Sequence, residues 1–130
     1  MELKFSMRVF LDCDDLQEST ISKINNEYNW SLMRKGLPIR KNSRFLAEQD
    51  CLVFKNIFSV FDANELNSKS IDKKIEEICK DLESMNIKGE RELYINLVSE
   101  NDQFGFLLPA NFLHTLSNFN VSLSINGIFI

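Results

Sequence analysis

Four segments of the chain alternate apolar and polar residues, which is the pattern of a β-strand with one buried face. These segments are Lys4–Leu11, Cys51–Phe61, Glu92–Ser99 and Val121–Ile125. The second segment carries apolar residues on both faces, so we expect it to lie in the interior of a sheet. Shorter apolar runs predict two further strands, at Trp30–Met33 and Phe104–Leu107.

Apolar residues spaced by three and four positions predict three helices. The clearest is expected at about Ser70–Met85, and Asn86 and Gly89 should end it. An earlier helix is expected at about Asp15–Asn26, because its first residues have the spacing of a capping box. A shorter helix is expected at Pro109–Asn118, since proline suits the first helical turn.

The order of these elements mixes helices and strands without regular βαβ alternation, which favours an α+β fold. Several connections, such as Asn101-Asp102, have hairpin length, so the sheet should be mostly antiparallel. We predict a single α+β domain over residues 1–130, with about five or six strands and with two main helices and a short third helix on one face. Apolar residues on the predicted inner faces should be buried together: Val9, Phe54, Ile75, Ile78, Leu82, Ile95 and Leu123.

The composition agrees with one globular domain, since 44% of the residues are hydrophobic and 26% are charged. The net charge is −4, but it is unevenly distributed. Residues 28–47 contain five Lys or Arg residues and no carboxylate, so the rest of the chain carries a net charge of −9. An acidic molecule is a poor general binder of nucleic acid, because that affinity rests on neutralising phosphates.

Each charged region suggests a binding surface. The acidic helix could dock a basic protein, because complementary charge accelerates and selects association. Its candidate contact residues are Glu76, Glu77, Asp81 and Glu83. The basic segment is an alternative anion or nucleic-acid site, in which an aromatic ring would stack beside the cations; its candidate residues are Trp30, Arg34, Lys35, Arg40, Lys41 and Arg44. Either region could instead be an ordinary solvated surface.

Candidate catalytic and metal-binding groups are few. The sequence has a single histidine, His114, with no GxSxG elbow and no glycine-rich phosphate loop. The three cysteines, Cys13, Cys51 and Cys79, form no CxxC pair, so we interpret them as small buried apolar residues. We therefore predict no catalytic residues, no metal site and no cofactor, and we expect that the chain is not an enzyme.

The first residues lack both the basic start and the apolar core of a signal peptide. No apolar run reaches the ~20 residues that a membrane span needs. We therefore expect a cytoplasmic protein with no membrane contact.

Three segments resemble a known bacterial domain family. They are the opening strand and Asp-rich turn Arg8–Leu16, the Lys35-Gly36 step, and the closing helix and strand Phe112–Ile125. In these segments the chain is similar to the bacterial domain of unknown function catalogued under the number 4279. The resemblance implies an α+β fold and no assigned chemistry.

In its size and acidity the chain also looks like the immunity proteins of bacterial toxin systems, which block a toxin by binding it. Toxin domains that cut nucleic acid tend to be basic, and an acidic surface would complement them. We therefore expect a non-enzymatic protein-binding inhibitor that neutralises a cognate bacterial toxin. The alternative is a nucleic-acid or anion-binding module that uses the basic segment 34–44.

Overall fold

The computed structural model describes residues 2–12, 18–39, 42–61, 71–100 and 107–129. Within these residues, five strands form one sheet: β1 (Glu2–Leu11), β2 (Trp30–Met33), β3 (Cys51–Val60), β4 (Gly89–Ser99) and β5 (Val121–Phe129). Their order across the sheet is β2-β3-β1-β4-β5. Neighbouring strands are antiparallel except β4 and β5, which are parallel. The predicted α+β fold with a mostly antiparallel sheet is confirmed.

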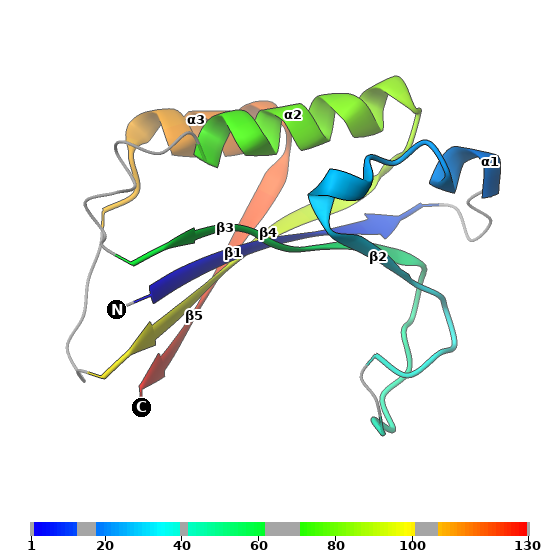
Figure 1. Ribbon diagram of the computed structural model, residues 1–130, viewed down its shortest axis with the longest axis horizontal. Helices are drawn as coiled ribbons and strands as arrows, with labels where there is room; N and C mark the ends of the chain where they lie inside the picture. The colour runs from blue at the N-terminus through cyan, green and yellow to red at the C-terminus, as the bar shows by residue number, and fades with distance from the viewer. Residues whose placement is uncertain (1, 13–17, 40–41, 62–70, 101–106, 130) are drawn as a thin grey trace.

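Two helices, α2 (Ile71–Ser84) and α3 (Ala110–Asn118), cover one face of this sheet (Figure 1). Helix α3 lies between β4 and β5 in the chain, and this crossover allows the two strands to run parallel. A four-residue helix, α1 (Glu18–Ile21), and a 3-10 turn, η1 (Asn26–Tyr28), precede β2. In the described part of the chain the longest helix has 14 residues, and no helix is long and apolar enough to cross a membrane.

The first helix ends earlier than the sequence predicted. Helix α1 stops at Ile21, so the predicted continuation to Asn26 is wrong. Asn25 instead begins η1, because its side chain accepts a hydrogen bond from the backbone N–H of Glu27 at 3.0 Å. Such a local bond competes with helical hydrogen bonding. The predicted strand at Phe104–Leu107 lies outside the described residues except for its last residue, which is not part of a strand.

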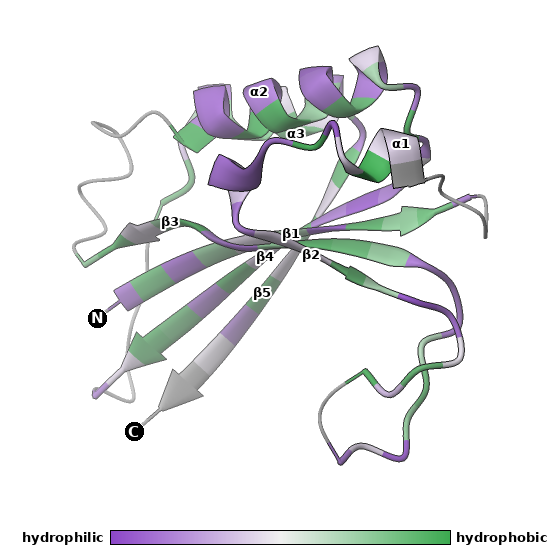
Figure 2. Cartoon of the chain, turned by 45° about the vertical axis from the view of Figure 1, so that its right-hand side comes forward, coloured by the Kyte–Doolittle hydropathy of each residue, from purple (hydrophilic) through white to green (hydrophobic). Residues whose placement is uncertain are grey.

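The core lies between the sheet and the helices α2 and α3. Alternate β1 residues point toward the helices and are fully buried: Leu3, Phe5, Met7 and Val9. Helix α2 meets them with an apolar stripe, and Figure 2 shows that its hydrophilic residues lie on the opposite side. Of the seven predicted core residues, Leu123 is only partly buried, and the other six are buried in one cluster.

The turn from α2 into β4 rests on two backbone requirements. Asn86 adopts a left-handed φ of 57°, and the N–H of Ile87 donates to the carbonyl of Leu82 at 2.9 Å, which ends the helix as predicted. Gly89 has a different role, because it is the first residue of β4 and lies against β1. A Cβ at this position would lie 2.1 Å from the carbonyl oxygen of Phe10, so the close approach of the strands requires glycine.

Candidate functional site

The segment between β2 and β3 leaves the sheet and folds below its open face, opposite the helices (Figure 1). We call the described residues of this segment, 36–39 and 42–47, the excursion. Its two arms are joined by backbone hydrogen bonds, from Gly36 N–H to the Ala47 carbonyl at 2.9 Å and from Ile39 N–H to the Phe45 carbonyl at 3.0 Å. A single β-bridge, Pro38 with Leu46, lies between these bonds. The excursion is therefore a loose hairpin.

A buried carboxylate fastens the base of the excursion. Asp50 is only 2% exposed, and it accepts hydrogen bonds from the backbone N–H of Lys35 at 2.8 Å and from Nη1 of Arg34 at 3.1 Å. The backbone carbonyl of Asp50 accepts from Leu11 N–H at 2.9 Å, and the Gln49 amide donates to the Leu11 carbonyl at 3.1 Å. These bonds tie both ends of the excursion to the end of β1.

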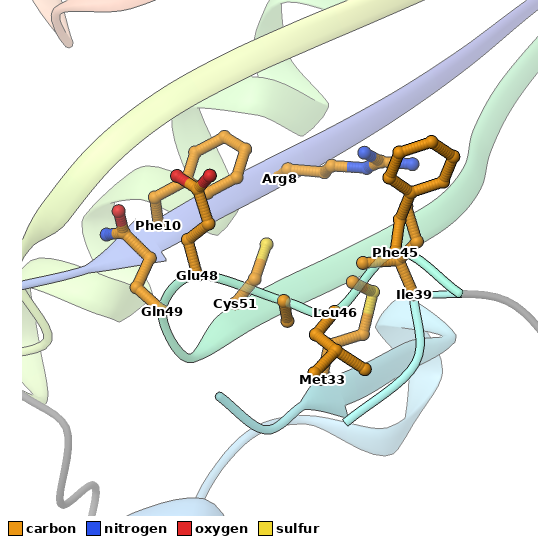
Figure 3. A pocket seen from close by; sticks show the side chains of 10 residues that line it. Arg8, Phe10, Met33, Ile39, Phe45, Leu46, Glu48, Gln49 and Cys51 are labelled. Carbon is orange, nitrogen blue, oxygen red and sulfur yellow. The ribbon is translucent and has the colours of Figure 1, made fainter. Parts of the chain in front are cut away.

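The excursion carries four large apolar side chains that are between 41% and 66% exposed: Leu37, Ile39, Phe45 and Leu46. Between it and the sheet lies a groove of about 390 Å³ (Figure 3). The groove is lined by Arg8, Phe10, Met33, Ile39, Phe45, Leu46, Ala47, Glu48, Gln49 and Cys51. We call this hollow the Arg8 groove. Clustered exposed apolar side chains beside a hollow are typical of a binding surface.

A positive charge lies on the sheet side of the groove. The guanidinium carbon of Arg8 is 4.9 Å from the centroid of the Tyr94 ring, within the range of a cation–π interaction. The Tyr94 hydroxyl donates a hydrogen bond to Glu92. Partial burial, together with this bond, raises the pKa of Tyr94 to about 12, so the hydroxyl stays protonated at neutral pH. Arg8 is therefore held on a neutral aromatic ring.

The described cysteines have the character of buried apolar residues, as predicted. Cys51 lines the groove, and burial raises the pKa of its thiol. Cys79 lies in the core, and burial raises its pKa to about 11. Thiols with raised pKa values are poor nucleophiles at neutral pH. His114 is exposed on α3, and Cys13 lies outside the described residues. The described residues contain no cluster of His, Cys, Asp and Glu that could hold a metal ion.

The four predicted acidic contact residues lie on α2, and each already interacts within the chain. Glu76 pairs with Lys80 at 2.8 Å, and Glu83 pairs with Arg91 at 3.2 Å. The hydroxyl of Tyr28 donates to Asp81 and, at 3.3 Å, to Glu77. The pKa of Tyr28 is raised mainly by burial and next by its hydrogen bond to the Asp81 carboxylate. The hydroxyl therefore keeps its proton and remains a hydrogen-bond donor. Helix α2 covers one face of the sheet and the excursion lies beyond the other face (Figure 1). The Arg8 groove, between the excursion and the sheet, is therefore on the face opposite α2.

The predicted basic site is divided between the two faces of the sheet. Arg34 is bound to Asp50, and Arg44 lies on the excursion with its guanidinium carbon 5.9 Å from the Phe45 ring centroid. Lys35 is exposed, and Arg40 and Lys41 lie outside the described residues. Trp30 is opposite Phe54 in the sheet and packs against the core on the helix-covered face. The structure therefore does not place Trp30 beside Arg44.

Sequence reasoning missed the Arg8 groove. Arg8 and Phe10 belong to the face of β1 that the alternation pattern predicts to be wet, and Phe45 and Leu46 follow basic residues in a segment without clear periodicity. The one feature of the sequence that could have indicated the groove is the apolar pair Phe45-Leu46 within a basic loop. No family model, no curated protein and no solved structure matches the chain. The resemblance to domain family 4279 therefore stays a prediction from its three segments.

Proposed function

We propose that this chain is a non-enzymatic protein-binding inhibitor that takes an aromatic side chain of its partner into the Arg8 groove. One observation carries the proposal: three large apolar side chains of the excursion, Ile39, Phe45 and Leu46, are between 41% and 66% exposed and line this groove together. Scattered exposed apolar residues are normal on a soluble protein, whereas a cluster beside a hollow marks a contact surface. Covering such a surface with a partner is favourable because it removes apolar area from water.

The chemistry of the groove suits an aromatic occupant. Its volume of about 390 Å³ is within the usual range for sites that enclose a small group. The guanidinium of Arg8 can interact with the face of an incoming ring, and the Phe45 ring offers an aromatic contact. Glu48 and Gln49 supply polar groups that can orient the backbone of the partner.

We further propose that the partner is a cognate bacterial toxin domain and that the chain acts in the cytoplasm. The small size of the chain and its net charge of −4 support this class of partner, because a basic toxin would be attracted to an acidic inhibitor. Helix α2, which carries the four carboxylates, covers the face of the sheet opposite the excursion, so in this proposal they assist the encounter rather than form the contact.

The proposal can be tested by co-expressing the chain with a toxin domain encoded by a neighbouring gene, and by measuring growth protection and the affinity of the purified pair. Phe45→Ser removes an exposed ring of the groove. Phe61→Ser is a matched control, because Phe61 is 68% exposed, Phe45 is 66% exposed, and Phe61 does not line the groove. A Glu76→Gln, Glu83→Gln variant tests the acidic surface.

We expect Phe45→Ser to weaken binding about tenfold or more, as the loss of an interface anchor does, and Phe61→Ser to leave it unchanged. The acidic variant should mainly slow association. Equal affinities for wild type and Phe45→Ser would show that the groove is not the docking site. A partner that gives neither a complex nor growth protection would overturn the inhibitor function itself.

A further inference from the structure

The last part of the chain contains no Asp, Glu, Lys or Arg residue. All 15 Lys and Arg residues and all 19 Asp and Glu residues lie in residues 1–102, and residues 103–130 contain none. This stretch supplies α3 and β5. A stretch of this length without these residues is unusual in a chain in which 26% of the residues are charged. Charged residues normally keep proteins soluble and prevent their association.

The charge-free stretch forms one edge of the sheet. Within the described residues β5 pairs with β4 alone, so its outer side ends the five-stranded sheet. The strand has nine residues and contains no proline. Exposed edges are normally protected by lysines, prolines, bulges or short strands. The opposite edge strand, β2, follows that rule, because it has four residues and is followed directly by Arg34 and Lys35.

Apolar side chains flank this open edge. Ile125 of β5 is 48% exposed, and Leu113 of α3 is 45% exposed. Helix α3, which carries Leu113, packs against β5, which carries Ile125. Among the described residues, this edge therefore combines strand backbone that no other strand pairs with, exposed apolar side chains, and no Asp, Glu, Lys or Arg residue.

We propose that this edge is the interface of a homodimer, in which β5 pairs antiparallel with β5 of a second copy and the sheet continues across a twofold axis. In such a pair each strand meets its own sequence, so a charge in the strand would lie near the like charge of the copy, which is destabilising. Neither β5 nor α3 contains an Asp, Glu, Lys or Arg residue that would cause this repulsion.

A second copy fits this edge better than a charged partner does. It supplies equal backbone donors and acceptors and the same apolar flank, whereas a basic or acidic protein finds no opposite charge here. The Arg8 groove lies toward the other end of the sheet, near β2 and β3, so both copies keep their grooves accessible. The dimer therefore does not depend on the proposed inhibitor function.

The test is the mass of the purified chain by sedimentation equilibrium across micromolar concentrations, at low and high salt. Ser124→Lys places a cation in the middle of β5, and Ser31→Lys makes the same change on the opposite edge strand. Hydrogen exchange of the β5 amides at low and high protein concentration reports whether this strand is covered.

We expect wild type and Ser31→Lys to dimerise and Ser124→Lys to be monomeric with an unchanged circular dichroism spectrum. Raising the salt concentration should strengthen the dimer, because two copies of charge −4 repel each other through the rest of their surfaces. Amides of β5 should become more protected as protein concentration rises.

A monomeric wild type would overturn the proposal. A dimer that persists in the Ser124→Lys variant would also overturn it. A dimer that is dissociated only by Ser31→Lys would overturn it too, because the interface would then lie at β2. If Ser124→Lys fails to fold, Asn126→Lys on the same face of β5 decides the question, because Asn126 is exposed. A folded Asn126→Lys chain that remains dimeric would count against the proposal.

Discussion

Removing the Asp50 carboxylate should loosen the excursion and destabilise the fold. This side chain is 2% exposed and accepts from the Lys35 backbone N–H at 2.8 Å and from Arg34 at 3.1 Å. Asp50→Ala removes both acceptors. Asp50→Asn keeps an oxygen that can accept from the Lys35 N–H but removes the negative charge.

The two contacts contribute unequally. A hydrogen bond to a buried charged acceptor is worth ~1.5–3 kcal/mol, which we assign to the Lys35 N–H. The Arg34 side chain is 36% exposed, so solvent screens its ion pair with Asp50, and we assign that pair ~1 kcal/mol or less. We therefore expect Asp50→Ala to lower the free energy of unfolding by about 3 kcal/mol and Asp50→Asn to lower it by about 1 kcal/mol.

Urea unfolding monitored by Trp30 fluorescence measures both values, because this is the single tryptophan and it packs against the core. Asp50→Ala should also weaken partner binding more than Asp50→Asn does, since Asp50 positions the excursion. An Asp50→Ala variant within ~0.5 kcal/mol of wild type, the range of an ordinary surface substitution, would refute this role of Asp50. An asparagine variant as unstable as the alanine variant would refute the assignment of most of the energy to the Lys35 N–H.

Two further predictions concern the core. Leu82→Ala should lower the free energy of unfolding by ~2–5 kcal/mol, because Leu82 is fully buried. Leu123→Ala should lower it by clearly less, because Leu123 is only partly buried. Equal losses for the two variants in urea unfolding would contradict this packing. Burial raises the pKa of Cys79 from its ordinary value of 9.0 to about 11. As the pH rises, the thiol of the unfolded chain therefore loses its proton before the thiol of the folded chain does. The free energy of unfolding should fall between these two pH values, by roughly 2–3 kcal/mol in total. This stabilising contribution of the protonated Cys79 thiol is fully present below pH 9. The stability of Cys79→Ala should fall less steeply at alkaline pH than that of wild type. Identical dependence of stability on pH in the variant and in wild type would refute the raised pKa of Cys79.

Local patterns predicted most of the elements correctly. The steps of three and four through α2 and the alternation of β1 follow from which side of each element is buried, so they can be read from neighbouring residues. The errors occur where another contact overrides the pattern. Asn25 bonds to a nearby backbone N–H and starts a new turn, and Gly89 serves the contact of β4 with Phe10 rather than the end of a helix.

The candidate site was less accessible to sequence reasoning. The spacing of Glu77 and Asp81 predicts that they share a helix face, but nothing local predicts that the Tyr28 hydroxyl, in η1, donates to both of them. The Arg8 groove joins the open face of β1 to a loop more than thirty positions away, around Phe45 and Leu46.

The sequence by itself determined the fold class, the helix-covered face of the sheet and most of the core, because periodic burial is a property of consecutive residues. Only the tertiary structure decided the strand order β2-β3-β1-β4-β5, the parallel pairing of β4 with β5 and the charge-free edge that β5 presents. It also decided which polar groups meet, since Asp50 reaches Arg34 and Arg8 reaches Tyr94 only after distant segments have packed. The physical reason is that such contacts depend on how whole elements dock, and no local pattern records that.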